Sequence, residues 1–364
     1  MSSRPRPRLP LRPRDALLAL LALSLRFFPM SADEIPRPAP LTIPAQAADW
    51  APQRQAIRTR LHELLGDLPP VPPAPLVRVI RTEEREGYRL EKFEFDNGAG
   101  ARVPGYTLLP ARRAGKAPGI LYCHWHGGQY DIGKEELFRT NATPVPAGPE
   151  LARRGYVVVA IDAGGFGERN GVGPAGATDA GGGGEMTWAK YHLWAGRTLW
   201  GMIVRDDRMA LDYLCRRPEV DPGRVAVTGI SMGATRTWWL MALDDRPRTG
   251  VAVGCLTRYQ DLIESRGLKY HGIYYFVPGM LRHFDTEAVV ALAAPRPLLF
   301  QTGDQDAGSP VAGIHAIDAA VRPLYRLLGR DGDFQNKVYP GVGHVYTPAM
   351  WQETLAWLAR ELNP

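Results

Sequence analysis

Short apolar runs recur along the chain and predict strands, and longer segments between them predict helices. The apolar runs cover residues 118–123, 157–161, 224–228, 295–303 and 336–340. Two further runs, 88–95 and 101–109, alternate apolar and polar positions around an Asn97-Gly98 turn, so they predict the first antiparallel hairpin of the sheet. Helices are predicted at 56–65, at 198–214, where the pattern is amphipathic, and from Ala234 onward.

The pentapeptide at 229–233, GISMG, follows one of these strands directly and precedes a helix. A G-x-S-x-G turn at such a junction exposes a nucleophilic serine, here Ser231. Gly229 and Gly233 leave room for the close approach of strand and helix. The helix directs its first N–H groups toward a developing oxyanion, and Met232 is expected to supply one of them. An ordinary turn can have the same G-x-S-x-G pattern, so the assignment of Ser231 as a nucleophile depends on finding its catalytic partners.

Candidate partners follow in the order that this kind of site uses, first an acid and then a histidine. Asp304 and Asp306 stand just beyond the strand 295–303, and His344 stands just beyond the strand 336–340. Groups at the carboxyl ends of neighbouring strands meet at one edge of an open sheet, so residues far apart in the sequence can converge there. A serine needs an adjacent base, and the base needs an orienting acid.

These residues and motifs make the chain resemble the α/β-hydrolases, in particular the branch of the dienelactone hydrolases, acetyl xylan esterases and prolyl oligopeptidases. The resemblance extends from Val77 to the C-terminus and implies a mostly parallel central sheet with helices on both faces. By this resemblance Ser231 is the nucleophile, His344 the general base and Asp306 the orienting acid, with Asp304 as a turn or capping residue. The segments that carry it are HWHGG at 124–128, DAGGFGERNG at 162–171, GISMGA at 229–234, GDQDAGSP at 303–310 and GVGH at 341–344.

The loop after the strand 118–123 is expected to complete the oxyanion hole. By similarity, its second donor is the N–H of Gly128, with Gly127 as the near alternative. His126 either contacts the substrate or packs under the loop, and neither it nor His124 is needed as the base. Family similarity also gives the Glu168-Arg169 pair a loop-holding function.

Two aromatic segments are expected to shape the substrate pocket. One follows the glycine-rich loop 163–185, and the other, at 258–285, lies where these folds insert a lid. Trp188, Tyr191 and Tyr274 could stack on a sugar ring or a phenolic ester. The alternative is that such aromatics pack the lid onto the body of the enzyme.

Composition narrows the choice of partners. The chain has 364 residues and a formal net charge of +6, of which +5 lies in the arginine-rich stretch before Pro29. The rest is near neutral, so nucleic acid is not an expected partner, and neither is a membrane span. Cys123, Cys215 and Cys255 read as small buried residues, and the charged group at 205–207 reads as a solvated face or a structural ion pair. No zinc spacing or nucleotide fingerprint occurs, so neither metal nor cofactor is expected.

The sequence divides into three segments. Residues 1–29 combine an arginine-rich start with a short apolar run, which fits a signal peptide and export. They fit equally a leading extension before a true start at Met30, which would make the protein cytoplasmic. Residues 30–76 form a proline-rich preface with one helix, and residues 77–364 form the catalytic domain.

The expected activity is a serine hydrolase that cleaves small-molecule carboxylic esters through an acyl-enzyme, with small-acyl or carbohydrate esters as substrates. A peptidase or amidase of the prolyl oligopeptidase type would use the same triad, but the roughly 75 residues before the catalytic domain are too few for that family's large recognition domain. A catalytically silent binding protein on the same fold is the other alternative, because fold does not determine function. The sequence does not specify an oligomeric state.

Overall fold

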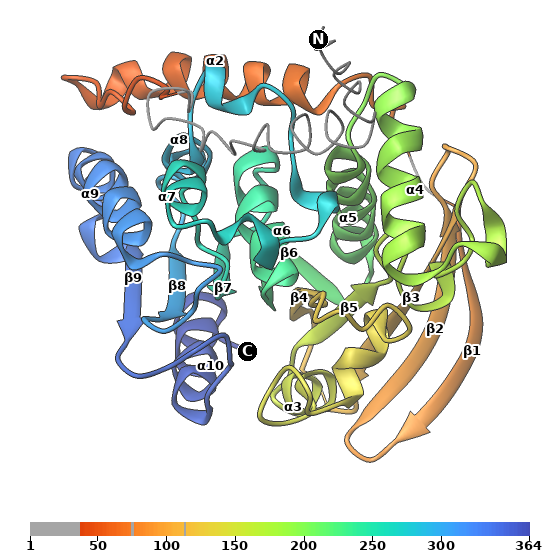
Figure 1. The fold of residues 1–364 in the computed structure, drawn as a ribbon. Coiled ribbons are helices and arrows are strands. Elements are labelled where there is room, and N and C mark those ends of the chain that lie inside the picture. Colours follow the sequence, from red (N-terminus) through yellow and green to blue (C-terminus); the bar gives the residue numbers. More distant parts are fainter. Residues whose placement is uncertain (1–36, 74–75, 113) are drawn as a thin grey trace, which may run out of the picture. The chain divides into compact units, whose positions relative to one another are not determined.

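A nine-stranded sheet runs through the computed structural model, which describes residues 37–73, 76–112 and 114–364 (Figure 1). Its strands lie in the order β1-β2-β3-β5-β4-β6-β7-β8-β9. Their bounds are β1 (Val77–Arg85), β2 (Tyr88–Asp96), β3 (Arg102–Pro110), β4 (Ala117–Cys123), β5 (Val157–Ile161), β6 (Val220–Ile230), β7 (Thr249–Val253), β8 (Leu298–Gly303) and β9 (Phe334–Tyr339).

Six neighbouring strands pair in parallel, in the order β5, β4, β6, β7, β8 and β9. This confirms the predicted mostly parallel sheet. At one side β1, β2 and β3 are antiparallel, and β3 joins β5 in antiparallel register. The predicted hairpin around Asn97-Gly98 connects β2 to β3, but it is the second hairpin and not the first. The sequence VRVIRTEER of β1 was not predicted as a strand, because it lies at the sheet edge with nearly all side chains exposed and lacks an apolar face.

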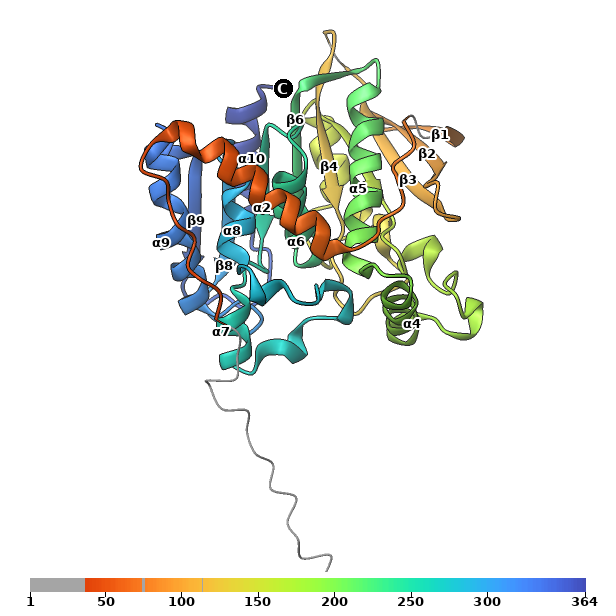
Figure 2. The same ribbon diagram turned by 90° about the horizontal axis from the view of Figure 1, so that it is seen from above.

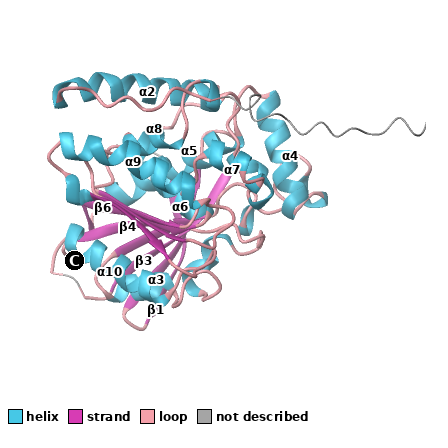
Figure 3. Cartoon of the chain, turned by 60° about the vertical axis from the view of Figure 1, so that its left-hand side comes forward, coloured by secondary structure: helices cyan, strands magenta, loops and turns pink. Residues whose placement is uncertain are grey.

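Helices cover both faces of the sheet, as predicted (Figure 3). One face packs against α5 (Leu199–Arg216), α6 (Met232–Leu243) and α9 (Val311–Leu327), and the other packs against α3 (Ala147–Arg153) and α10 (Pro348–Leu362). Each face buries its own apolar core. Threonine caps start two of these helices: the hydroxyl of Thr198 accepts from the N–H of Gly201, and that of Thr347 accepts from the N–H of Met350.

Helix α2 (Trp50–Leu65) lies outside the helical layer and crosses α8 (Thr286–Ala291) (Figures 1 and 2). It begins six residues before its predicted start and buries the side chains of Trp50, Leu61 and Leu65. Arg54 and Arg58 both pair with Asp245 at the end of α6. Residues from Arg37 onward therefore belong to the same compact unit as the sheet. The proposed leader at 1–29 lies outside the described residues.

Two further segments stand at the carboxyl edge of the parallel strands. Helix α4 (Gly181–Trp194) begins inside the four-glycine run that was predicted to be loop as far as Glu185. The expected lid contains α7 (Tyr259–Glu264) and short 3-10 turns, and it buries Tyr274 and Tyr275. Among the helices of the described ranges, none has both the length and the apolar character needed to cross a bilayer.

Candidate active site

Ser231 occupies the turn between β6 and α6 with φ 59° and ψ −120°. A side chain in this backbone region is strained by about 1–3 kcal/mol, which surrounding contacts must offset. One such contact is the hydrogen bond from the N–H of Ser231 to the carbonyl of Val253, 2.9 Å long. A Cβ atom at Gly229 or Gly233 would lie 2.3 or 2.0 Å from the carbonyl oxygen of Cys123. The predicted need for glycine on both sides of the serine is therefore confirmed.

The imidazole of His344 and the carboxylate of Asp306 form a hydrogen bond of 2.6 Å between Nδ1 and Oδ2. Both residues follow strands whose carboxyl ends are adjacent, β9 and β8. Burial by itself would raise the pKa of Asp306, but the hydrogen bond and charge of His344, with the N–H of Gly308, hold that pKa below its usual range. With Nδ1 bound to the acid, Nε2 of His344 is left for a reacting group.

Asp304 has a different contact. Its carboxylate accepts the N–H of Gly341 at 2.7 Å and the side-chain amide of Gln305 at 3.2 Å. These bonds hold the turn that precedes His344, which is the turn or capping function predicted for this residue. The structure thus separates the two aspartates, and only Asp306 contacts the histidine.

Ser231, Asp306 and His344 line one pocket of about 490 Å³. His126, Gly127, Gly128 and Tyr274 line it as well, so four more of the predicted site residues reach this cavity. Within the described residues, no hydrogen bond joins the hydroxyl of Ser231 to His344. Catalytic hydrogen bonds are often long in the absence of substrate and shorten only when it binds.

The recorded neighbour of the serine hydroxyl is Cys255, whose Sγ lies 3.8 Å from Oγ of Ser231. Cys255 is buried as predicted, but it lies beyond the end of β7 and not in a strand. Burial raises the pKa of its thiol to about 12, so the thiol is protonated and a poor nucleophile. The adjacent Gly254 has φ 69°, which favours glycine, and a Cβ there would also lie in tight contact, 3.2 Å from Cε1 of His344.

The loop after β4 is organised by His126. Its Nδ1 accepts the N–H of Gly128 at 3.0 Å, and Nε2 lies 2.7 Å from Oε2 of Glu185. Because Nδ1 is an acceptor, Nε2 carries the proton and donates to the carboxylate. The N–H of Gly128 is therefore occupied, which argues against the predicted second oxyanion donor. No partner within the described residues is recorded for the N–H of Gly127, the predicted alternative.

Glu185 was not predicted as a site residue. It is almost fully buried and also accepts from the hydroxyl of Tyr130 at 3.0 Å and from the N–H of Tyr274 at 3.3 Å. The ring of Tyr274 stacks on His126 at 5.2 Å between centroids. His126 therefore both faces the pocket and packs under its loop. The glycine run before Glu185 led to the prediction of a loop where the helix that positions Glu185 begins. In this part of the sequence, only the aromatic residues after Glu185 indicated a site.

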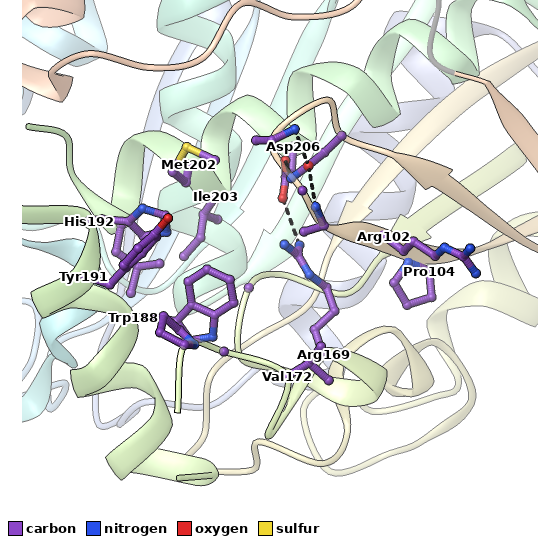
Figure 4. Close-up of a pocket in the computed structure, with 18 of the residues that line it drawn as sticks. Arg102, Pro104, Arg169, Val172, Trp188, Tyr191, His192, Met202, Ile203 and Asp206 are labelled. Carbon is purple, nitrogen blue, oxygen red and sulfur yellow. Dashed lines mark hydrogen bonds and ion pairs between the residues drawn. The ribbon is translucent and has the colours of Figure 1, made fainter. Parts of the chain in front are cut away.

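Trp188 and Tyr191, two predicted substrate contacts, do not line the pocket of Ser231. They lie beside a separate pocket together with His192 and Arg169 (Figure 4). The sequence prediction placed them near the catalytic edge because their helix follows the glycine-rich loop, but α4 turns these side chains toward β3 and α5. The structure therefore does not bring these two predicted substrate contacts to the pocket of the serine.

The charged residues singled out in the sequence are structural. Arg169 pairs with Asp206 at 2.9 Å, and Asp207 pairs with Arg236 at 2.5 Å, with all four side chains buried. The alternative of a solvated face at 205–207 was wrong. Glu168 does not pair with its neighbour Arg169 but with Lys92 and Lys134. Within the described residues, no group of three His, Cys, Asp or Glu side chains could hold a metal ion.

The chain is similar to known proteins in both sequence and structure. The protein named "Putative hydrolase YtaP" of Bacillus subtilis (strain 168) is 35% identical over 307 residues, which cover 84% of this chain and 98% of that protein. A solved "putative acetyl xylan esterase" from Bacteroides fragilis NCTC 9343 is 20% identical with a TM-score of 0.73, covering 99% of this chain and 97% of that one. The glucuronoyl esterase from Solibacter usitatus is 19% identical with a TM-score of 0.66, covering 89% and 97%.

At these identities the two solved structures show a shared fold, which is the α/β-hydrolase fold predicted from the sequence. The family model described as "Abhydrolase family" matches residues 37–312, which is most of the chain and includes the segment before β1. With the close Bacillus relative aligned along nearly its whole length, the protein belongs to the abhydrolase family.

Proposed function

We propose that the protein is a serine hydrolase that cleaves carboxylic esters through Ser231, His344 and Asp306. The observation that carries this proposal is the strained turn at Ser231, which opens into the same pocket as the His344–Asp306 hydrogen bond. Strain of this kind persists where a fold needs one side chain in a particular position. A serine, a base and an orienting acid in one pocket constitute the machinery of acyl transfer.

The reaction runs in two steps. Nε2 of His344 takes the hydroxyl proton of Ser231 as Oγ attacks the ester carbonyl carbon, and the carbonyl oxygen becomes an oxyanion. The imidazolium then gives its proton to the leaving alcohol as the C–O bond breaks, which leaves an acyl-serine. A water molecule, deprotonated by the same histidine, then attacks the acyl carbon. The bond from this carbon to Oγ of Ser231 breaks, the imidazolium returns the proton to Oγ, and the acid is released. Throughout, Asp306 holds Nδ1 of His344 and stabilises its positive charge.

Two backbone N–H groups stabilise the oxyanion. Met232 is the first residue of α6, so its N–H has no partner within the helix and sits at the positive end of the helix dipole. The loop after β4 supplies the second donor. We assign it to Gly127 in this structure, because the N–H of Gly128, the donor expected from the sequence, is bound to His126. A single such donor contributes about 3–4 kcal/mol to transition-state stabilisation.

Small-acyl esters, including those carried by carbohydrates, are the proposed substrates. The names of the two solved neighbours, an acetyl xylan esterase and a glucuronoyl esterase, support this class. The pocket itself is consistent with it, because the lid lines the pocket with Tyr270, Tyr274 and Lys269. Rings and hydrogen-bonding groups at a pocket mouth suit the polar faces and C–H faces of sugars.

The test is covalent labelling with a fluorophosphonate, read by intact mass, beside hydrolysis of p-nitrophenyl acetate and of acetylated xylo-oligosaccharides. The wild type should gain one adduct, Ser231→Ala should gain none and lose turnover, and Ser265→Ala on the lid should behave as the wild type. No adduct on folded wild-type protein would contradict the proposal and favour a silent binding protein. Faster cleavage of a matched anilide than of the ester would favour an amidase.

A further inference from the structure

A second pocket, of about 620 Å³, lies between α4, α5 and the strand β3 (Figure 4). It shares no lining residue with the pocket of Ser231. Nothing in the proposed ester chemistry uses it, although it is the larger of the two cavities. The chemical character of its walls therefore indicates a separate binding function.

One wall of the second pocket is aromatic and apolar. Trp188 stacks on His192 with 5.2 Å between ring centroids and 23° between planes, and Tyr191 meets Trp188 edge to face. Met202 and Ile203 of α5 continue this wall. Burial, with the charges of Arg197 and Arg169, lowers the pKa of His192 to about 4, so its ring is neutral near neutral pH. A wall of stacked, uncharged rings suits the flat face of a cyclic ligand.

The charged side chains that line the second pocket differ in whether they have an ion-pair partner. Each carboxylate in its lining is already held by basic partners: Asp206 by Arg169, Glu168 by two lysines, and Glu94 by two arginines. Arg197 differs, because no carboxylate within the described residues lies at ion-pairing distance from it. Its Nε donates to Nδ1 of His192 at 3.2 Å, and its guanidinium lies 6.0 Å from the ring of Tyr191.

The contacts of Arg197 leave its two terminal nitrogens without a recorded partner among the described residues. Two parallel N–H groups on one guanidinium match the two oxygens of a carboxylate. The bond to His192 and the neighbouring Tyr191 ring restrict where this guanidinium can point. A preorganised fork next to an aromatic wall is a recognition element for a particular kind of anion.

From this combination we infer that the second pocket binds a carboxylate carried on a six-membered ring, with the ring against Trp188 and Tyr191 and the carboxylate on Arg197. An aromatic acid and a uronic acid share this chemistry. Along α4, Glu185, Trp188 and His192 are spaced i, i+3 and i+7 and so lie on one face. The bound ring would sit about 5–9 Å along this helix from the residue that holds the loop of the catalytic pocket.

The experiment is isothermal titration of the full-length Ser231→Ala protein with sodium D-glucuronate and, separately, with sodium 4-hydroxybenzoate. D-glucose and 4-hydroxybenzyl alcohol are the uncharged counterparts. At least one carboxylate should bind about tenfold or more tightly than its uncharged counterpart, and the two arms show whether the natural ring is a sugar or an aromatic. This binding does not depend on ester hydrolysis, so it can succeed or fail independently of the proposed function.

Arg197→Gln should weaken the titrated binding about tenfold or more, whereas Arg197→Lys should retain part of it, since the charge remains but the fork is lost. Trp188→Leu should weaken binding of the ring, and Arg282→Gln, which removes an exposed arginine outside the pocket, should not. The melting temperature of each variant checks that it is folded. In addition, Arg197→Gln in a protein that keeps Ser231 should still be labelled by the fluorophosphonate. Equal binding of charged and uncharged rings, or unchanged binding in Arg197→Gln, would overturn the inference, as would no binding of either acid.

Discussion

Glu185 and His126 are joined by a hydrogen bond of 2.7 Å that connects α4 to the loop after β4. The same imidazole accepts the N–H of Gly128, so one side chain sets the orientation of the adjacent peptide groups. The loop lines the pocket of Ser231, and the N–H of Gly127 in this loop is the proposed second oxyanion donor. The acid and the histidine thus act on the reaction through the backbone, as positioning residues.

Removing Glu185 is expected to impair the chemical step more than substrate binding. Glu185→Ala should lower kcat about 10- to 100-fold while KM changes little, because a misplaced donor weakens stabilisation of the transition state. Glu185→Gln should retain most of the activity, since its amide oxygen can still accept from His126. Steady-state kinetics on p-nitrophenyl acetate measure this, with the exposed neighbour variant Met186→Ala as control. Equal losses in the Ala and Gln variants would contradict the positioning argument.

The two aspartates after β8 are expected to differ sharply. Asp306→Asn should lower kcat by about three to four orders of magnitude, because the amide no longer holds the imidazole in the required tautomer or stabilises its charge. Asp304→Asn should stay within about tenfold of the wild type, since its amide oxygen can still accept the N–H of Gly341. Parallel kcat/KM measurements compare the two variants. The reverse order of losses would assign the acid to Asp304.

Gly233 is expected to tolerate no side chain. In Gly233→Ala the new Cβ would lie 2.0 Å from the carbonyl oxygen of Cys123, so strand and helix must separate. The free energy of unfolding should fall by at least about 2 kcal/mol, and fluorophosphonate labelling should be lost. Gly332→Ala is the matched control, because nothing lies within 4 Å of a Cβ there. Thermal melting and labelling of both variants check this, and similar melting temperatures would contradict it.

Glu136 gives the fold an identifiable pH dependence. Its carboxylate accepts from the N–H of Trp125 at 2.7 Å and from the hydroxyl of Tyr122 at 2.5 Å, and complete burial raises its pKa to about 7. In the unfolded chain the carboxyl group of Glu136 loses its proton near pH 4.5. Between about pH 4.5 and pH 7, only the folded state therefore keeps this carboxyl group protonated. Stability contributed by this group is therefore full at low pH and decreases as the pH rises through 7.

Between pH 5 and pH 8, the group should account for a loss of about 2.5 kcal/mol in the free energy of unfolding. Glu136→Gln should remove this part of the pH dependence, whereas Glu135→Gln, at the half-buried neighbour, should keep it. Urea denaturation of the three proteins at both pH values gives the comparison. A wild type and a Glu136→Gln variant with the same slope would show that Glu136 does not titrate in this range.

Local sequence was sufficient for the parts of the site that depend on short-range geometry. The serine turn is encoded in five consecutive residues, and Asp306 and His344 could be placed because each follows a predicted strand at the same sheet edge. Strand β5 was predicted with its observed bounds, since five consecutive apolar residues buried on both faces leave little alternative.

Contacts across long separations could not be predicted in this way. His126 and Glu185 are 59 residues apart, and nothing in either segment indicates the other. Cys255 reaches Ser231 only because β7 lies beside β6 and the chain turns with a positive φ just beyond it. Trp188 and Tyr191 were misplaced for the same reason, because the start of α4 within a glycine run changes which cavity its side chains face.

The docking of α2 has a consequence for the order in which the chain can fold. Arg54 donates to the carbonyl of Leu292 and Arg58 to that of Ala242, partners 238 and 184 residues further along the chain. An isolated helix of this length is only marginally stable in water. On a ribosome, this helix is made before its binding surface, which does not exist until the chain has been synthesised beyond α8. Until then the helix cannot dock and is open to chaperones and proteases.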